Sequence, residues 1–292
     1  MTWVNAVVQG ILLGGLYALF ACGLSLLFGV MRIINLAHGD IAVLGAFLIW
    51  TLVHETGLSP FLATLLILPA ALVIGYLLHV TLLERSLRAG ELIPLLTTFG
   101  LAIVIQNLLL QLYSPDVKSL SASAGSITTS SWHITDQVSI SALGALTLAL
   151  AIAVLGGLQL FLGRTGMGRE MRATAQDADT AALVGVDARA VYARATAIAV
   201  AIGFLAGGFM ALRSTFEPSS GPTQLIFAFE AVVIGGFGSL WGTLVGGIVL
   251  GIAQTIGAEI NPQYSVIAGH LVFLAVLALP RSGILAGRLA RA

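Results

Sequence analysis

The sequence predicts an all-α membrane protein, a polytopic bundle of about eight to nine hydrophobic segments with at least one broken helix. Of the 292 residues, 58% are hydrophobic and only 9% are charged, whereas a soluble domain carries about 25% charged residues. Apolar runs of about 18 or more residues recur along the chain, each long enough to cross a hydrocarbon layer as a helix. The runs are continuous, unlike the alternating segments of a transmembrane β-barrel.

One transmembrane domain, residues 1–292, is therefore expected, and its first segments follow one another regularly. The pattern becomes irregular at 224 to 257, where glycines interrupt the apolar run, and a last span is predicted at 264 to 280. The regular segments are predicted at 4 to 31, 37 to 53, 60 to 83, 92 to 113, 138 to 163 and 193 to 213.

The orientation follows from the basic residues, which are retained on the cytoplasmic side of a membrane. The loops at 84 to 91 and 164 to 194 and the tail after 280 are rich in arginine, whereas the intervening loops hold only Lys118, with Arg213 at a border. This distribution predicts an outside N-terminus and a cytoplasmic C-terminus. A chain that is outside at 214 to 223 and inside after 280 must cross the membrane an odd number of times. Residues 224 to 257 are therefore expected to cross twice, turning near "GGFGS", so that their first part is a half-span of about 20 Å.

The loop at 114 to 137 is the longest one predicted to face outward, and it is rich in Ser and Thr. Two interpretations remain open. It is either a solvated connector or part of a docking face for an extracytoplasmic partner.

Glu230, in "FAFEAVVIGG", is an ionisable residue within an apolar run, which is energetically costly and therefore marks a candidate site. It either lines a polar path or binds an ammonium group, or it lies at the interface and bonds to backbone. The glycines that follow are expected to open the helix and free backbone amides for a ligand or another helix end. The candidate pathway or helix break comprises Glu230, Gly235, Gly236, Gly238 and Ser239.

A polar cluster in "INLAHGDIAVLGAF" joins the first two predicted spans: Asn35, His38, Gly39 and Asp40. A carboxylate and an imidazole are the residue types of a proton relay, but a metal site needs at least three ligands and no second cluster completes one. The favoured interpretation is a structural turn at the cytoplasmic surface, with His38 and Asp40 capping the next helix. No metal site is expected.

Glycines four residues apart put bare backbone on one helix face and allow neighbouring helices to approach closely. Such pairs include Gly10 and Gly14, Gly242 and Gly246, and Gly247 and Gly251. They indicate tight packing and do not identify a substrate.

The predicted cytoplasmic loop at 164 to 194 is the longest charged segment. Its sequence predicts a short helix that begins near Asp177 or Asp179, stops at Gly185 and is followed by a second helix from Asp187. Such a short helix either lies on the bilayer or inserts into a groove of a partner.

The sequence contains none of the common motifs for catalysis or nucleotide binding. The only lysine, Lys118, has no phosphate-binding loop around it, and no nucleophile elbow, zinc-protease helix or paired-cysteine motif occurs. The chain is therefore expected to be no enzyme and to bind no cofactor of its own.

The chain resembles the membrane permeases of branched-chain amino acid ABC importers, of the LivH type. The resemblance covers nearly the whole chain and is carried by "GLYALFACGLSLLFGVMRIINLAHGDIAVLGAF" at 15–47, "GMGREMRATAQDADTAALVGVDARAVY" at 166–192, "AVVIGGFGSLWGTLVGGIVLG" at 231–251 and "PRSGIL" at 280–285. It implies a bacterial cytoplasmic membrane protein that works with a second, similar permease, two cytoplasmic ATPase subunits that hold ATP and magnesium, and an extracytoplasmic binding protein.

The same resemblance implies that "DTAALVG" is the loop that couples the permease to the ATPase. The usual pattern is Glu-Ala-Ala-x-x-x-Gly, and Asp179 and Thr180 replace its first two residues here. The candidate coupling residues are Asp177, Asp179, Thr180, Ala181, Ala182, Gly185 and Asp187.

The expected function is transport of branched-chain or other hydrophobic amino acids, and relatives with this pattern also suggest urea, short amides or another amino acid. A different class is an ion- or proton-driven secondary carrier that uses Glu230, His38 and Asp40. An intramembrane enzyme, which His38→Ala would inactivate, is the third class.

Overall fold

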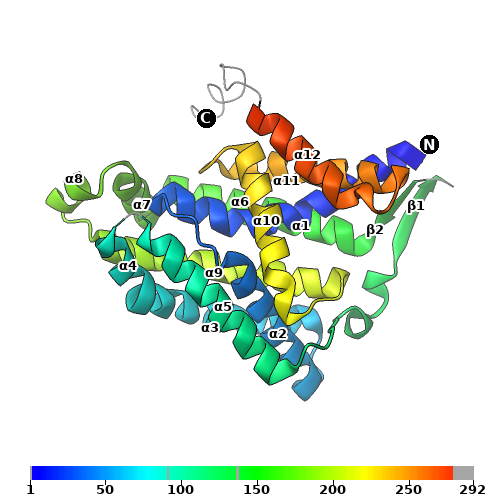
Figure 1. Cartoon of the computed structure of the whole chain (residues 1–292), viewed down its shortest axis with the longest axis horizontal. Coiled ribbons are helices and arrows are strands. Elements are labelled where there is room, and N and C mark those ends of the chain that lie inside the picture. The colour runs from blue at the N-terminus through cyan, green and yellow to red at the C-terminus, as the bar shows by residue number, and fades with distance from the viewer. Residues whose placement is uncertain (1, 91, 136–137, 279–292) are drawn as a thin grey trace.

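The computed structural model describes residues 2–90, 92–135 and 138–278, which form a long helical bundle with two distinct ends (Figure 1). Helix α8 projects at one end, called the α8 end below, and the strands β1 and β2 lie at the other, called the hairpin end. The elements are α1 (Thr2–Met31), α2 (His38–Thr56), α3 (Pro60–Leu78), the π-helix η1 (His79–Leu83), α4 (Glu84–Ala89), α5 (Ile93–Tyr113), the 3₁₀ segment η2 (Ala122–Thr128), β1 (Ser131–Thr135), β2 (Val138–Ser141), α6 (Ala142–Arg164), α7 (Gly166–Gln176), α8 (Ala178–Leu183), α9 (Ala188–Arg213), η3 (Pro218–Ser220), α10 (Gly221–Gly235), α11 (Leu240–Ile260) and α12 (Tyr264–Ala278).

Seven helical spans in the described part of the chain are long and apolar enough to cross a membrane. Helices α10 and α12, of 15 residues each, are shorter. At 1.5 Å per residue such a helix is about 22 Å long, less than the hydrocarbon thickness of about 30 Å. The predicted count of eight to nine segments is consistent with these nine helices, and the predicted multi-pass helical bundle is confirmed. The end of the last predicted span, the "PRSGIL" motif and the basic tail lie outside the described residues.

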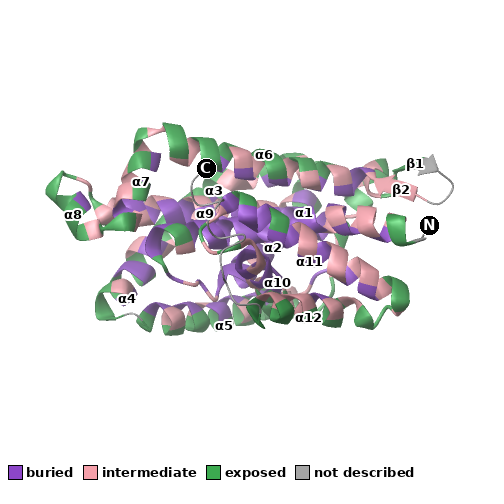
Figure 2. Cartoon of the chain, turned by 90° about the horizontal axis from the view of Figure 1, so that it is seen from above, coloured by how far each residue is buried: buried purple, intermediate pink, exposed green. Residues whose placement is uncertain are grey.

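Helices α1 and α9 form the centre of the bundle (Figure 2). Each has 83% of its most apolar stretch buried, against 22% for the spans that begin at Pro60 and Ala142. Alanine and glycine predominate in the buried part of α9, so neighbouring helices pack around it closely. The exposed leucines of the outer helices, such as Leu65 and Leu96, are expected to face lipid.

The predicted close approach of neighbouring helices is present where Gly10 and Gly14 of α1 pack against the α11 segment that contains Gly247 and Gly251. A Cβ atom added to Gly10 would lie 2.5 Å from Ile252 Cα, and one added to Gly14 would lie 2.4 Å from Ile248 Cα. From the other side, a Cβ at Gly251 would lie 2.3 Å from the Gly10 carbonyl oxygen. The two backbones are therefore in direct contact.

The predicted break after Glu230 is present between α10 and α11. Gly236 and Gly238 have positive φ angles of 90° and 78°, which favour glycine, and the Ser239 hydroxyl caps α11 by accepting the Gly242 amide at 3.1 Å. The break lies beside α1, because a Cβ added to Gly29 would be 3.4 Å from Gly238 Cα. At 15 residues, helix α10 has about the length predicted for the half-span.

The segment expected to be a loop at 114 to 137 contains more structure than the sequence indicated. It holds η2 and strand β1, which pairs antiparallel with β2. Residues 138 to 141, assigned from the sequence to the start of a span, form β2, and α6 begins at Ala142. The predicted start of this span at 138 is therefore wrong, because the alternating Val/Ile and Ser residues of 138 to 141 suit a strand.

Candidate functional site

Helix α8 matches the short helix that the charged loop predicted. The Asp177 side chain caps it by accepting the amides of Asp179 at 3.0 Å and Thr180 at 3.1 Å. The helix ends before Gly185, whose φ of 86° favours glycine. Asp187 then caps α9 by accepting the Arg189 amide at 3.0 Å. The hydrogen bond from the Thr180 hydroxyl, followed by that from its amide, holds the pKa of Asp177 below its usual value.

Two large aliphatic side chains protrude from the end of α8. Leu183 is 86% exposed and Val184 is 79% exposed, although Ala181 on the same turn is buried. They end α8, which lies at the far tip of the molecule, beyond the long apolar spans (Figure 1). Adjacent exposed aliphatic side chains in an otherwise polar loop are typical of a contact with another molecule.

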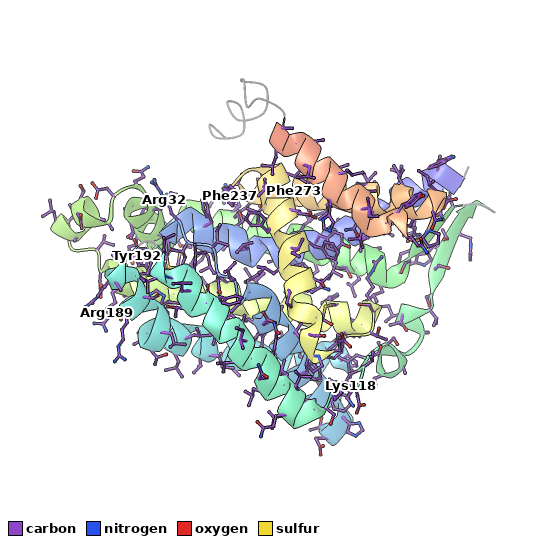
Figure 3. All side chains as sticks on the ribbon, in the orientation of Figure 1. Arg32, Lys118, Arg189, Tyr192, Phe237 and Phe273 are labelled. Carbon is purple, nitrogen blue, oxygen red and sulfur yellow. The ribbon has the colours of Figure 1, made fainter. Side chains whose placement is uncertain are left out.

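Ion pairs fasten this loop to the bundle. Arg189, at the start of α9, bonds through Nε to Glu84 Oε2 at 2.5 Å, and Arg88 bonds to Glu84 Oε1 at 2.7 Å. Arg194 bonds to Glu170 of α7 at 3.1 Å. Figure 3 shows Arg189 and Tyr192 together at this end. The role of Glu84 was not predicted from the sequence, because its partner Arg189 is 105 residues away.

The π-helix η1 lies directly before Glu84 and packs on α9. Its buried His79 bonds through Nδ1 to the Thr196 hydroxyl at 3.0 Å. A π-turn inserts an extra residue into a helix and often occurs at functional sites. No pattern in the sequence indicated it.

The polar cluster before α2 is buried, not exposed at a surface. Asn35, His38 and Asp40 are each only 1% exposed. The residue at the cap position of α2 is Ala37, whose amide is bonded by Asn35 Oδ1 at 3.0 Å, while His38 Nε2 lies 2.8 Å from the Phe20 carbonyl oxygen. The expectation of a surface turn capped by His38 and Asp40 is therefore wrong. The chain turns back into the bundle after α1, so these polar groups need partners inside it.

Asp40 and Gly39 connect α2 to α5 and α10. Gln106 of α5 donates to Asp40 Oδ1 at 2.9 Å. A Cβ atom added to Gly39 would lie 2.0 Å from the Gly221 carbonyl oxygen, so the first turns of α2 and α10 are in backbone contact. The cluster is a junction of α1, α2, α5 and α10, consistent with the structural turn that the sequence suggested.

Glu230 belongs to a second buried polar cluster, formed by four helices. Its Oε1 bonds to His270 Nδ1 of α12, whereas Oε2 is buried and has no partner among the described residues. Beside it the Tyr17 hydroxyl donates to Gln254 Oε1 at 2.5 Å, and Gln254 Nε2 is likewise buried without a described partner. Phe227 stacks between Tyr17 and His270. Glu230 was predicted from the sequence as a candidate site residue. Its partner His270 was not, because it is an isolated histidine in an apolar run.

The predicted site residues do not form one site. The coupling candidates lie at the α8 end, whereas the junction of α2 and the Glu230 cluster lie inside the bundle. In Figure 3, Phe237 of the glycine-rich break and Phe273 of α12 lie close together near the end of α10, where Phe229 contacts both rings. In the part of the chain that the structure describes, no three His, Cys, Asp or Glu side chains gather as metal ligands.

Comparison with known proteins agrees with this architecture. The family described as "Branched-chain amino acid transport system / permease component" matches residues 6–278. The chain is 30% identical to the high-affinity branched-chain amino acid transport system permease protein BraD of Pseudomonas aeruginosa, over 97% of this chain and 95% of BraD. It is 28% identical to LivH of Salmonella typhimurium, over 95% and 93% of the two chains. A more distant relative, the fructose import permease protein FrcC of Rhizobium meliloti, is 26% identical over 83% of this chain and 69% of FrcC.

Proposed function

Because this chain belongs to the family of branched-chain amino acid transport system permease components, we propose that it is the membrane subunit of an ATP-driven importer. It forms the translocation path for branched-chain or other hydrophobic amino acids. A second, homologous permease completes the path, two cytoplasmic ATPase subunits bind ATP and magnesium, and an extracytoplasmic binding protein delivers the solute. In this proposal the α8 end faces the cytoplasm and the hairpin end faces outward.

The observation that carries the proposal is helix α8 with its exposed Leu183 and Val184. A transporter needs a contact that differs between its two states, so that closure of the ATPase shifts the equilibrium of the membrane part. A capped helix that ends in two aliphatic side chains provides a rigid knob for a groove on the ATPase. The proposed coupling residues are Asp177, Asp179, Thr180, Ala181, Ala182, Gly185 and Asp187, and we add Leu183 and Val184 because their side chains are exposed.

The ion pairs of the α8 end supply the next step. Glu84 binds the start of α9 through Arg189, and Glu170 binds it one turn further through Arg194. Helix α7 leads directly into α8, so in this proposal a push on α8 reaches α9 through α7 and the pair of Glu170 and Arg194; α9 is the most buried helix of the bundle together with α1.

The substrate is proposed from the family, since the polar groups inside the bundle are few. The Glu230 cluster fits the ammonium group of an amino acid, because a carboxylate lies beside the rings of Tyr17 and Phe227. The binding protein then supplies most of the selectivity. Import of urea, a short amide or another amino acid by the same machinery is the alternative.

Reconstitution tests the proposal. The complete complex in proteoliposomes should accumulate radiolabelled leucine only with ATP. The double variant L183E/V184E should abolish uptake and ATPase docking, because two carboxylates would be buried at an apolar contact. The matched control Gln176→Glu adds charge at an exposed position just before α8 and should transport normally. Normal uptake by L183E/V184E would refute the coupling role.

A secondary carrier is the second candidate, favoured by the pair of the buried Glu230 and the partly exposed His270. A carrier of this class couples solute to an ion or proton through such groups. Vesicles that hold this chain alone would then accumulate solute along a proton gradient without nucleotide. Uptake under those conditions would replace the importer proposal.

A further inference from the structure

A cavity of about 450 Å³ opens at the hairpin end of the bundle. It is lined by the N-terminal part of α1, η2, the junction of β2 with α6, and the last residues of α9. This volume lies within the range of small-molecule sites, about 300 to 1,000 Å³. None of the residue roles proposed above uses it.

Arg213, the last residue of α9, brings a positive charge to the cavity. Among the described residues its guanidinium has no hydrogen-bond or ion-pair partner, and none of the described lining residues is acidic. Lys118, by contrast, already has partners, because its ammonium group lies 3.5 Å from the Asp116 carboxylate and over the Trp50 ring. A guanidinium presents a planar fork of donors that matches a carboxylate.

The remaining polar lining consists largely of acceptors. The Thr128 hydroxyl donates to backbone carbonyl oxygens at 3.0 and 3.1 Å and the Thr129 hydroxyl donates to one at 3.2 Å, so both oxygens keep free lone pairs. Gln9 donates through Nε2 to the Ser139 carbonyl oxygen at 2.7 Å, which leaves its Oε1 to accept. The phosphodiester of a lipid headgroup offers no hydrogen to such acceptors, whereas an ammonium group offers three.

We propose that this cavity is an outer subsite for a zwitterionic α-amino acid, with the carboxylate on Arg213 and the ammonium group on the oxygens of Gln9, Thr128 and Thr129. Leu143 and Leu212 supply apolar lining for an aliphatic side chain. The inference rests on the proposed function for its substrate class and places a first contact with the solute at the hairpin end, before the bundle is crossed.

Cysteine protection tests the subsite without the ATPase. Ala122 lines the cavity and is exposed, and the native Cys22 is buried, so a maleimide should report only the cysteine of Ala122→Cys. In nanodiscs, millimolar L-leucine should slow its modification. L-leucinol, which lacks the carboxylate, and 4-methylpentanoate, which lacks the ammonium group, should protect far less. Gln263→Cys, in an exposed turn at the same end, should be unaffected by all three.

The arginine is tested in the same background. Arg213→Gln should raise the half-protecting leucine concentration about tenfold or more, because a charge-assisted pair is lost, and Arg213→Lys should recover part of the effect. Equal protection by leucine and leucinol in the parent would overturn the proposal even if Arg213→Gln failed to fold. Protection by phosphatidylglycerol with no effect of leucine would assign the cavity to a lipid headgroup and also overturn it.

The two proposals fail separately. Specific protection by leucine in a chain that shows no ATP-dependent uptake would retain the subsite and refute the importer. ATP-dependent leucine uptake without protection of the cysteine by leucine would retain the importer and refute the subsite.

Discussion

Gly14→Ala should destabilise the bundle through the contact between α1 and α11. The added Cβ would lie 2.4 Å from Ile248 Cα and 2.7 Å from the Gly247 carbonyl oxygen. Ordinary van der Waals contact begins near 3.4 Å, so the helices must separate by roughly 1 Å along a tightly packed interface. Because the obstructing atoms are backbone, no side-chain rotation relieves the clash. Overpacking of this kind costs about 1 to 3 kcal/mol.

Gly157→Ala is the matched control. Gly157 is an exposed helical residue of α6, and a Cβ there would meet nothing within 4 Å. Both substitutions gain the same helix propensity, up to about 1 kcal/mol, so the difference between them isolates the packing cost. Thermal unfolding in detergent, followed by circular dichroism, should show Gly14→Ala melting several degrees below Gly157→Ala. Equal midpoints would refute the inference that the two backbones touch.

Three further outcomes follow from the α8 end and the Glu230 cluster. Gly185→Pro should insert normally but uncouple ATP hydrolysis from uptake, because proline cannot adopt a φ of 86°; ordinary uptake at ordinary ATPase levels would count against the coupling role. Glu230→Gln should lower the stability of the bundle by about 1 to 2 kcal/mol, since its bond to His270 loses charge assistance, and unchanged uptake kinetics in the same variant would make Glu230 structural. The pKa of Asp177 is lowered in the folded loop, so its contribution to capping is complete at neutral pH and is lost as the pH falls below about 4. Protection of the Thr180 amide, measured by hydrogen exchange, should fall over the same pH range in the native chain. It should not do so in Asp177→Asn, which caps the helix without titrating.

The elements that local chemistry determines were predictable from the sequence. The α8 helix follows from Asp177 as a cap, Gly185 as a stop and Asp187 as a second cap, all within 11 residues. The half-span α10 followed from the parity of the crossings and from the glycines at 235, 236 and 238. In both places the signal lies in the segment itself, so no tertiary contact was needed.

The features that were mispredicted or missed depend on distant partners. His38 and Asp40 were placed at a surface because polar residues usually lie there, yet Phe20 of α1 and Gln106 of α5 satisfy them inside the bundle. His270 is a lone histidine until α12 brings it to Glu230. The hairpin at 131–141 was hidden because its short strands adjoin an apolar run that resembles the start of a span.

The contacts of α9 indicate how a displacement at the α8 end would spread. A Cβ added to Gly207 of α9 would lie 2.0 Å from the Ala42 carbonyl oxygen of α2, and Gly39 of α2 meets Gly221 of α10 in the same way. These are backbone contacts, so no flexible side chain lies between the helices to absorb a movement. A shift of α9 would therefore move α2 and the start of α10 with it. Helix α10 carries Glu230, which connects the exposed tip at Leu183 to the buried polar cluster through rigid elements.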